Sequence, residues 1–132
     1  MRFEDLADFL RVRPGHGVAQ EGDDLVETPF VLPGTTEPLV IRVTRMTGED
    51  GPLLVTDGGA LAASLSGRAV DVARLSETAP EGFRTALEAT GAGVDDEGRV
   101  FVVAGAPDLL KHAVAAVTSG VMMLGTLAAA SR

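Results

Sequence analysis

Residues 53–61, with the sequence LLVTDGGAL, constrain the fold more than any other part of the chain. A short apolar run stops at an acidic residue and two glycines, and a helical pattern follows. This order predicts a strand over 53–56, a tight turn, and a helix over about 59–66 that ends at Gly67. We expect Asp57 to cap that helix, and loss of such a cap costs on the order of 1 kcal/mol.

Two further strands are predicted before this junction. Residues 25–32 and 39–46 alternate apolar and polar side chains, which is typical of strands. Pro29 has no N–H to donate, so it indicates an edge or a bulge in the first strand. The short connections favour an antiparallel meander. A small hairpin over 94–103 adds a fourth main strand at 99–103.

Helical periodicity is clearest at the two ends of the chain and in one internal segment. Apolar side chains follow helical spacing over residues 3–12, 80–90 and 107–130. The length fits one domain, so residues 1–132 are predicted to form a single α+β unit. In this unit a small antiparallel sheet is covered by helices, and the C-terminal helix is the longest.

The last expected helix carries apolar side chains on two adjacent rows, which is wider than docking one helix on a sheet requires. We therefore predict a homodimer formed through this helix, because exposed apolar patches usually mark interfaces. The expected contact residues are Val117, Gly120, Val121 and Leu124. The alternative is a helix buried within its own domain. A membrane span is not expected, because Ala, Gly, Ser and Thr dilute the hydrophobicity of residues 113–130.

Composition and charge exclude several classes of function. The net charge of −8 argues against general binding to nucleic-acid phosphates. The chain contains no cysteine, which excludes disulfides, thiolate catalysis and cysteine-ligated zinc. The first residues, MRFED, are acidic and lack the apolar core of a signal peptide, so we expect a cytoplasmic protein.

Three segments together carry a resemblance to a known family. The residues ETPF at 27–30, the strand at 39–46 and the motif LVTDGG at 54–59 resemble domain of unknown function 1828, which occurs in bacterial and phage proteins. The resemblance covers about residues 20–105. It implies a shared fold and a link to mobile elements or phage–host conflict, and it assigns no catalytic residues.

Two candidate sites share the same aspartate. The first is a ligand-binding turn, in which a carboxylate and backbone N–H groups meet a ligand at a helix N-terminus. It comprises Thr56, Asp57, Gly58 and Gly59. Capping and a close-packed turn explain the same residue types, and we prefer that structural interpretation. The second is a magnesium site built from Asp24, Glu27 and Asp57, although a solvated strand edge also explains the first two acids.

No motif for catalysis or nucleotide binding is present. The chain has no P-loop, no Gly-x-Gly-x-x-Gly fingerprint and no Gly-x-Ser-x-Gly nucleophile elbow. We therefore predict no metal or nucleotide cofactor. The function that follows is a non-enzymatic protein-interaction or regulatory module, accessory to phage–host conflict. The alternative is a metal-dependent hydrolase or nuclease that uses the three clustered carboxylates.

Overall fold

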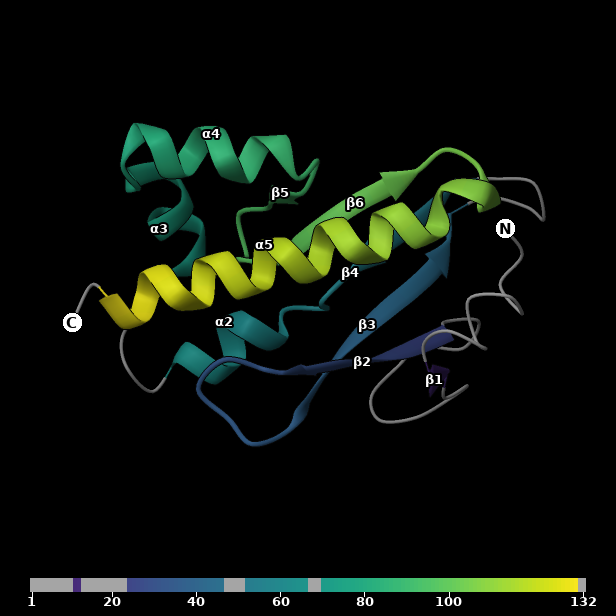
Figure 1. Cartoon of the computed structure of the whole chain (residues 1–132), viewed down its shortest axis with the longest axis horizontal. Coiled ribbons are helices and arrows are strands. Elements are labelled where there is room, and N and C mark those ends of the chain that lie inside the picture. The colour runs from purple at the N-terminus through teal and green to yellow at the C-terminus, as the bar shows by residue number, and fades with distance from the viewer. Residues whose placement is uncertain (1–10, 13–23, 47–51, 67–69, 131–132) are drawn as a thin grey trace.

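The structure, a computed structural model, describes residues 11–12, 24–46, 52–66 and 70–130. An antiparallel six-stranded sheet has the strand order β1-β2-β3-β4-β6-β5 (Figure 1). The strands are β1 (Arg11–Val12), β2 (Asp24–Val31), β3 (Pro38–Arg45), β4 (Leu53–Thr56), β5 (Gly93–Val94) and β6 (Val100–Ala104). The helices are α2 (Ala60–Leu65), α3 (Val72–Thr78), α4 (Glu81–Ala89), the short 3-10 helix η2 (Pro107–Leu109) and α5 (Leu110–Ala130). The predicted α+β class and antiparallel meander are confirmed.

The meander follows the expected strands closely. Strand β4 has the predicted bounds, and β2 and β3 each begin one residue earlier than predicted. The pairing of β2 with β3 shifts register between Glu27 and Val31, where Pro29 interrupts the ladder. The hydroxyl of Thr28 partly compensates, because it donates to the Leu39 carbonyl oxygen at 2.9 Å. The bulge inferred from the proline is therefore confirmed.

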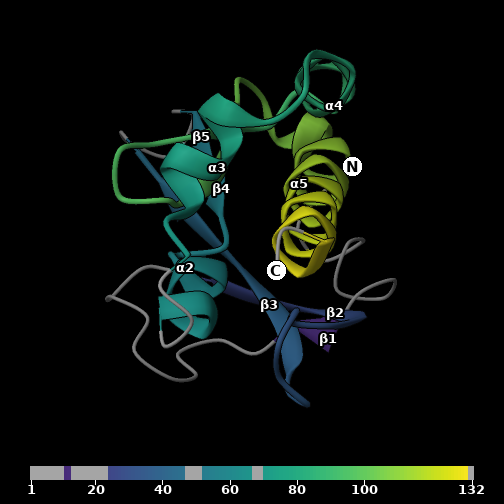
Figure 2. The same ribbon diagram turned by 90° about the vertical axis from the view of Figure 1, so that its left-hand side faces the viewer.

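Helix α5 lies along one face of the sheet, against β6, β4 and β3 (Figures 1 and 2). Alternate side chains of the strands point toward it and are buried, among them Ile41, Val43 and Val55. By length and composition alone α5 could also cross a membrane, and half of its apolar window is buried inside the chain.

The residues predicted to form an intermolecular contact lie in the chain's own core. Val117, Val121 and Leu124 are fully buried, and Gly120 is buried with them. A Cβ atom on Gly120 would lie 3.1 Å from Cγ1 of Val100, so the glycine serves the close approach of α5 to its own sheet. The predicted interface residues are therefore wrong.

The two apolar rows of α5 have an internal explanation. The sheet packs on one row, and α4 and the residues after it pack beside the other, since Leu87 and Ala92 also lie against Gly120. The periodicity of a helix cannot distinguish a second layer of the same chain from a partner chain. Homodimer formation itself stays a prediction.

Two other segments differ from expectation. Of the helix predicted over residues 3–12, residues 3–10 lie outside the described part, and Arg11 and Val12 form a strand paired with Glu27 and Val26. Strand pairing of these two residues replaced their local helical preference. Helix α3 was not predicted. It is short, and Asp71 caps it by accepting a hydrogen bond from the Arg74 N–H at 3.2 Å.

Candidate functional site

The Thr-Asp-Gly-Gly turn connects β4 to α2, as the sequence predicts. Gly58 and Gly59 have φ angles of 65° and 84°, in the left-handed region that side chains with a Cβ atom rarely adopt. A Cβ atom on Gly58 would also lie 3.3 Å from Nε of Arg42, whose guanidinium group packs on the turn. Both glycines are thus explained by backbone geometry and close packing.

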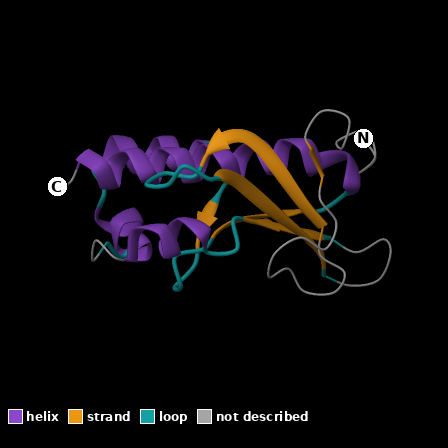
Figure 3. Cartoon of the chain, turned by 90° about the horizontal axis from the view of Figure 1, so that it is seen from below, coloured by secondary structure: helices purple, strands orange, loops and turns teal. Residues whose placement is uncertain are grey.

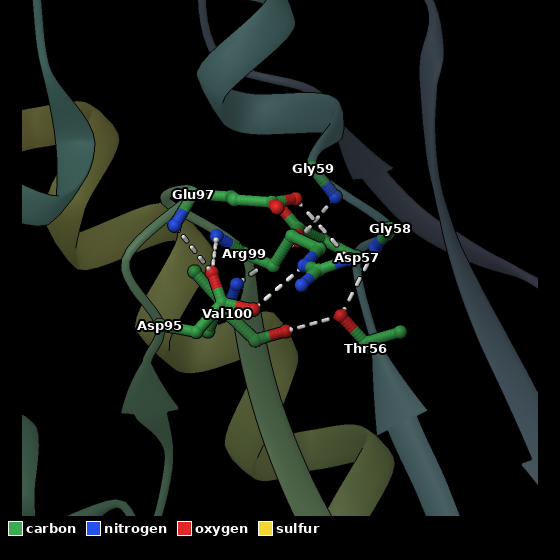
Figure 4. Close-up of polar contacts among 8 residues, drawn as sticks. All are labelled: Thr56, Asp57, Gly58, Gly59, Asp95, Glu97, Arg99 and Val100. Carbon is green, nitrogen blue, oxygen red and sulfur yellow. Dashed lines mark hydrogen bonds and ion pairs between the residues drawn. The ribbon is translucent and has the colours of Figure 1, made fainter.

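Asp57 is the centre of the hydrogen-bonded cluster in this turn (Figure 4). Its Oδ1 atom accepts from the N–H groups of Gly59 at 2.9 Å and Val100 at 3.0 Å, and Oδ2 accepts from Leu61 at 3.1 Å. The predicted contact between this carboxylate and the N-terminus of the helix is confirmed. Gly59 holds the N-cap position itself, so Asp57 reaches the helix from two residues earlier.

The same turn is tied to β6, a contact that the sequence did not indicate. The Thr56 hydroxyl donates to the Val100 carbonyl oxygen at 2.8 Å and accepts from the Gly58 N–H at 3.1 Å. The Asp57 N–H also donates to the Val100 carbonyl oxygen, at 3.1 Å. The end of β4 and the start of β6 are therefore held together by side chains as well as by the strand ladder.

The turn has no spare donors for an anion. The N–H groups of Gly58, Gly59 and Leu61 already donate to Thr56 and Asp57 side chains. The Ala60 N–H donates to the Asp57 carbonyl oxygen at 3.1 Å. A phosphate or carboxylate ligand would have to break these bonds. The structural interpretation of the candidate ligand turn accounts for these N–H groups and for the side chains of Thr56 and Asp57.

Burial and hydrogen bonding act in opposite directions on Asp57. Its side chain is buried, and this desolvation raises its pKa above the ordinary value of 3.8. Hydrogen bonds from the backbone of Gly59, Leu61 and Val100 lower the pKa and offset part of this shift, while the charge of Asp95 adds to the rise. Burial prevails, so the neutral form of this carboxyl group is favoured relative to the unfolded chain.

A second acidic group lies beside the turn in a different environment. Asp95 accepts from the Arg99 Nε at 2.6 Å and from the Arg99 and Glu97 N–H groups at 2.9 Å each. Desolvation acts to raise the pKa of Asp95, but these hydrogen bonds outweigh it and lower the pKa. Arg99 is thus engaged by its own hairpin.

The carboxylates proposed for a magnesium site do not come together. Asp24 pairs with Val43 and Glu27 with Val40, so their side chains project from opposite faces of β2. Strand β3 separates both of them from Asp57 at the end of β4. Among the described residues, no group of three His, Asp or Glu side chains could hold a metal ion. The sequence placed these acids near one another along the chain, but alternation and strand order separate them.

A surface that the sequence analysis did not single out lies on the sheet face opposite α5. Cross-strand pairing aligns Thr44, Leu54 and Val103 in one row, and Arg42, Thr56 and Phe101 in the next. Figure 3 shows the long C-terminal helix running along one side of the strands. We call the other side the open face, and its residues are Arg42, Thr44, Met46, Leu54, Phe101 and Val103.

The open face is apolar and accessible. Val103 is 48% exposed and Met46 is 51% exposed, and Leu54 and Phe101 are half-buried. Arg42 is the one charged residue in this set, and it makes no ion pair with any other described residue. The strand alternation could have located these positions, but the sequence does not show which of these side chains stay exposed.

Comparison with known proteins gives no functional assignment. No protein-family model matches the chain, and neither the curated proteins nor the solved structures contain a match. The resemblance to domain of unknown function 1828 stays a prediction.

Proposed function

We propose that the chain is a non-enzymatic protein-interaction module with a regulatory role, and that its binding surface is the open face of the sheet. The observation that carries this proposal is the apolar row of the exposed Val103 and the half-buried Leu54, next to the exposed Met46. Contiguous exposed apolar side chains on a soluble protein commonly mark interaction sites. The partner we infer is a protein with an apolar surface.

Arg42 supplies the polar element of this surface. Its guanidinium group is held against Gly58 and stands beside the apolar row through the pairing of Arg42 with Thr56. A guanidinium fork binds carboxylates in a bidentate manner and is enriched at protein interfaces. We infer that the partner places a carboxylate at this position, at the edge of its apolar contact.

The biological setting is proposed from the sequence alone. The resemblance to a family of bacterial and phage proteins supports an accessory role in phage–host conflict. We also propose a cytoplasmic location, with which the burial of half of the apolar window of α5 inside the chain is compatible. The carboxylates of the hydrolase alternative lie on different faces and strands, so no observation favours that alternative over binding.

Capture of partners from the native host with two matched variants tests the proposal. Val103→Glu places a charge on the open face, whereas Phe30→Glu makes the same kind of change on β2, outside that face, at a similar exposure of 47%. We expect Val103→Glu to lose the captured protein and Phe30→Glu to retain it. Loss of a hot-spot residue at an interface costs about 2 kcal/mol or more, which is about thirtyfold in affinity.

Two results would contradict the proposed surface. Equal capture by both variants would place the contact elsewhere, and equal loss would show that any added charge abolishes binding. Light scattering on the same samples detects self-association, because a homodimer formed through the open face would dissociate in Val103→Glu alone.

A further inference from the structure

A groove of about 920 Å³ lies between α3 and the C-terminal half of α5, away from the open face. Its walls are the α3 residues Arg74, Leu75 and Thr78 and the α5 residues Met122 and Ala129. Leu65, Val70 and the β2–β3 turn at Pro33 complete it. Sites for small ligands usually measure about 300–1,000 Å³ and are mainly apolar with a few polar groups.

Small residues on α5 create this groove. Gly125 packs directly under Pro33, since a Cβ atom there would overlap the proline ring. Ala128 and Ala129 follow on the same helix, and both line the groove with small side chains. The hollow is therefore a product of how α5 meets the β2–β3 turn.

Most polar groups along the groove are already engaged. The hydroxyls of Thr78 and Thr126 donate to the carbonyl oxygens of Arg74 and Met122, at 2.9 Å each. The Asp71 carboxylate accepts from the Arg74 N–H, as the cap of α3. The guanidinium group of Arg74 is different, because it makes no hydrogen bond or ion pair with another described residue.

We propose that this groove binds a small amphipathic carboxylate, an unbranched acyl chain whose carboxylate pairs with Arg74. The acyl chain of the ligand would lie on Met122, Ala129 and Leu75, where its binding removes apolar surface from water. The carboxylate would receive charge-assisted hydrogen bonds from the guanidinium group. The volume and the single uncommitted cation among the described lining residues favour this occupant over a protein segment.

Calorimetric titration with octanoate, decanoate and dodecanoate, each below its micelle concentration, tests the apolar half of the proposal. We expect saturable binding of one molecule per chain. Affinity should rise by about two- to fourfold per added methylene, since full burial of each methylene corresponds to about fourfold. Absence of saturable binding, or affinity that does not depend on chain length, would overturn the proposal.

The pairing of the ligand carboxylate with Arg74 is tested by two matched ligands and two matched variants. Decanoate should bind more tightly than 1-decanol, and Arg74→Gln should weaken decanoate by about three- to fivefold while leaving 1-decanol unchanged, as for an exposed ion pair. Arg84→Gln on α4 is the control, because Arg84 is also exposed but does not line the groove. Equal effects of the two variants, or equal affinities for the acid and the alcohol, would contradict the assigned pairing.

NMR chemical shifts of the protein locate the bound acyl chain independently of its affinity. Decanoate should shift the methyl signals of Met122 and Ala129 and leave that of Val103 in place. Shifts confined to the open face would contradict the groove. An acidic amphipathic peptide that displaces bound decanoate would show that both ligands compete for this groove. If the groove binds the peptide but does not bind decanoate, it is a protein-docking site and the proposal is overturned.

Discussion

Substitution of Asp57 by alanine removes more than a helix cap. The carboxylate accepts hydrogen bonds from Gly59, Leu61 and Val100, and the last of these lies 43 residues away on β6. The free energy of unfolding should therefore fall by more than the 1 kcal/mol expected from capping alone. Loss of this one side chain loosens both the start of α2 and the contact between the end of β4 and the start of β6.

The magnitude follows from which N–H groups lose their acceptor. Leu61 and Val100 are fully buried, so water cannot readily replace the carboxylate at either N–H group. A buried donor left without a partner costs about 1–3 kcal/mol. Gly59 is partly exposed and adds little, and relief of the carboxylate's own desolvation offsets part of the loss. The expected cost is about 2–4 kcal/mol, a large share of the 5–15 kcal/mol typical of a domain.

Urea denaturation followed by circular dichroism measures this cost against a matched control. Asp71→Ala removes a cap that makes a single hydrogen bond, to the exposed N–H of Arg74, and it should cost about 1 kcal/mol or less. The Asp57 variant should be destabilised at least twice as much. Equal destabilisation by both substitutions would refute the reasoning, because it would mean that the Val100 contact contributes nothing.

Three further outcomes are expected. Gly125→Ala should destabilise the fold by about 1–3 kcal/mol, because the added Cβ atom would overlap Pro33. Gly82 in α4 has open space around it, so Gly82→Ala should stabilise the fold by about 0.5 kcal/mol. The opposite order of the two variants in thermal melts would contradict the packing of α5. Leu124→Glu should abolish cooperative unfolding, because this side chain is fully buried within the chain; a folded monomer by circular dichroism and light scattering would instead support the interface predicted from the sequence. Because the pKa of Asp57 is raised, the folded chain keeps a proton on this carboxyl group that the unfolded chain releases. The contribution of Asp57 to the free energy of unfolding should therefore fall as pH rises from 3.8 through the raised pKa. Urea titrations across this range should show the cost of Asp57→Asn shrinking with rising pH; a growing cost would contradict the direction of the shift.

Local signals in the sequence were sufficient for the meander and for its junction with α2. The apolar run at 53–56, the acid and the two glycines fix a strand, a turn and a helix start within a few residues. Pro29 likewise marked the irregularity in β2. Each of these features depends on backbone preferences that one short segment expresses by itself.

Contacts between distant segments were beyond the reach of the sequence. The bond between Asp57 and Val100 depends on β6 lying beside β4, which no local pattern specifies. The apolar rows of α5 were correctly recognised as buried surface, but their partners turned out to be strands and α4 of the same chain. The acids on β2 were close in sequence yet separated by strand alternation.

We propose that the Asp57 turn maintains the framework while the open face binds the partner. Capture of the host partner by Asp57→Asn, at a temperature where circular dichroism shows it folded, tests this claim most directly. We expect Asp57→Asn to capture as much partner as the wild type, and Val103→Glu to capture none. Normal capture by Val103→Glu together with loss of capture by a folded Asp57→Asn would contradict the claim and assign the function to the turn.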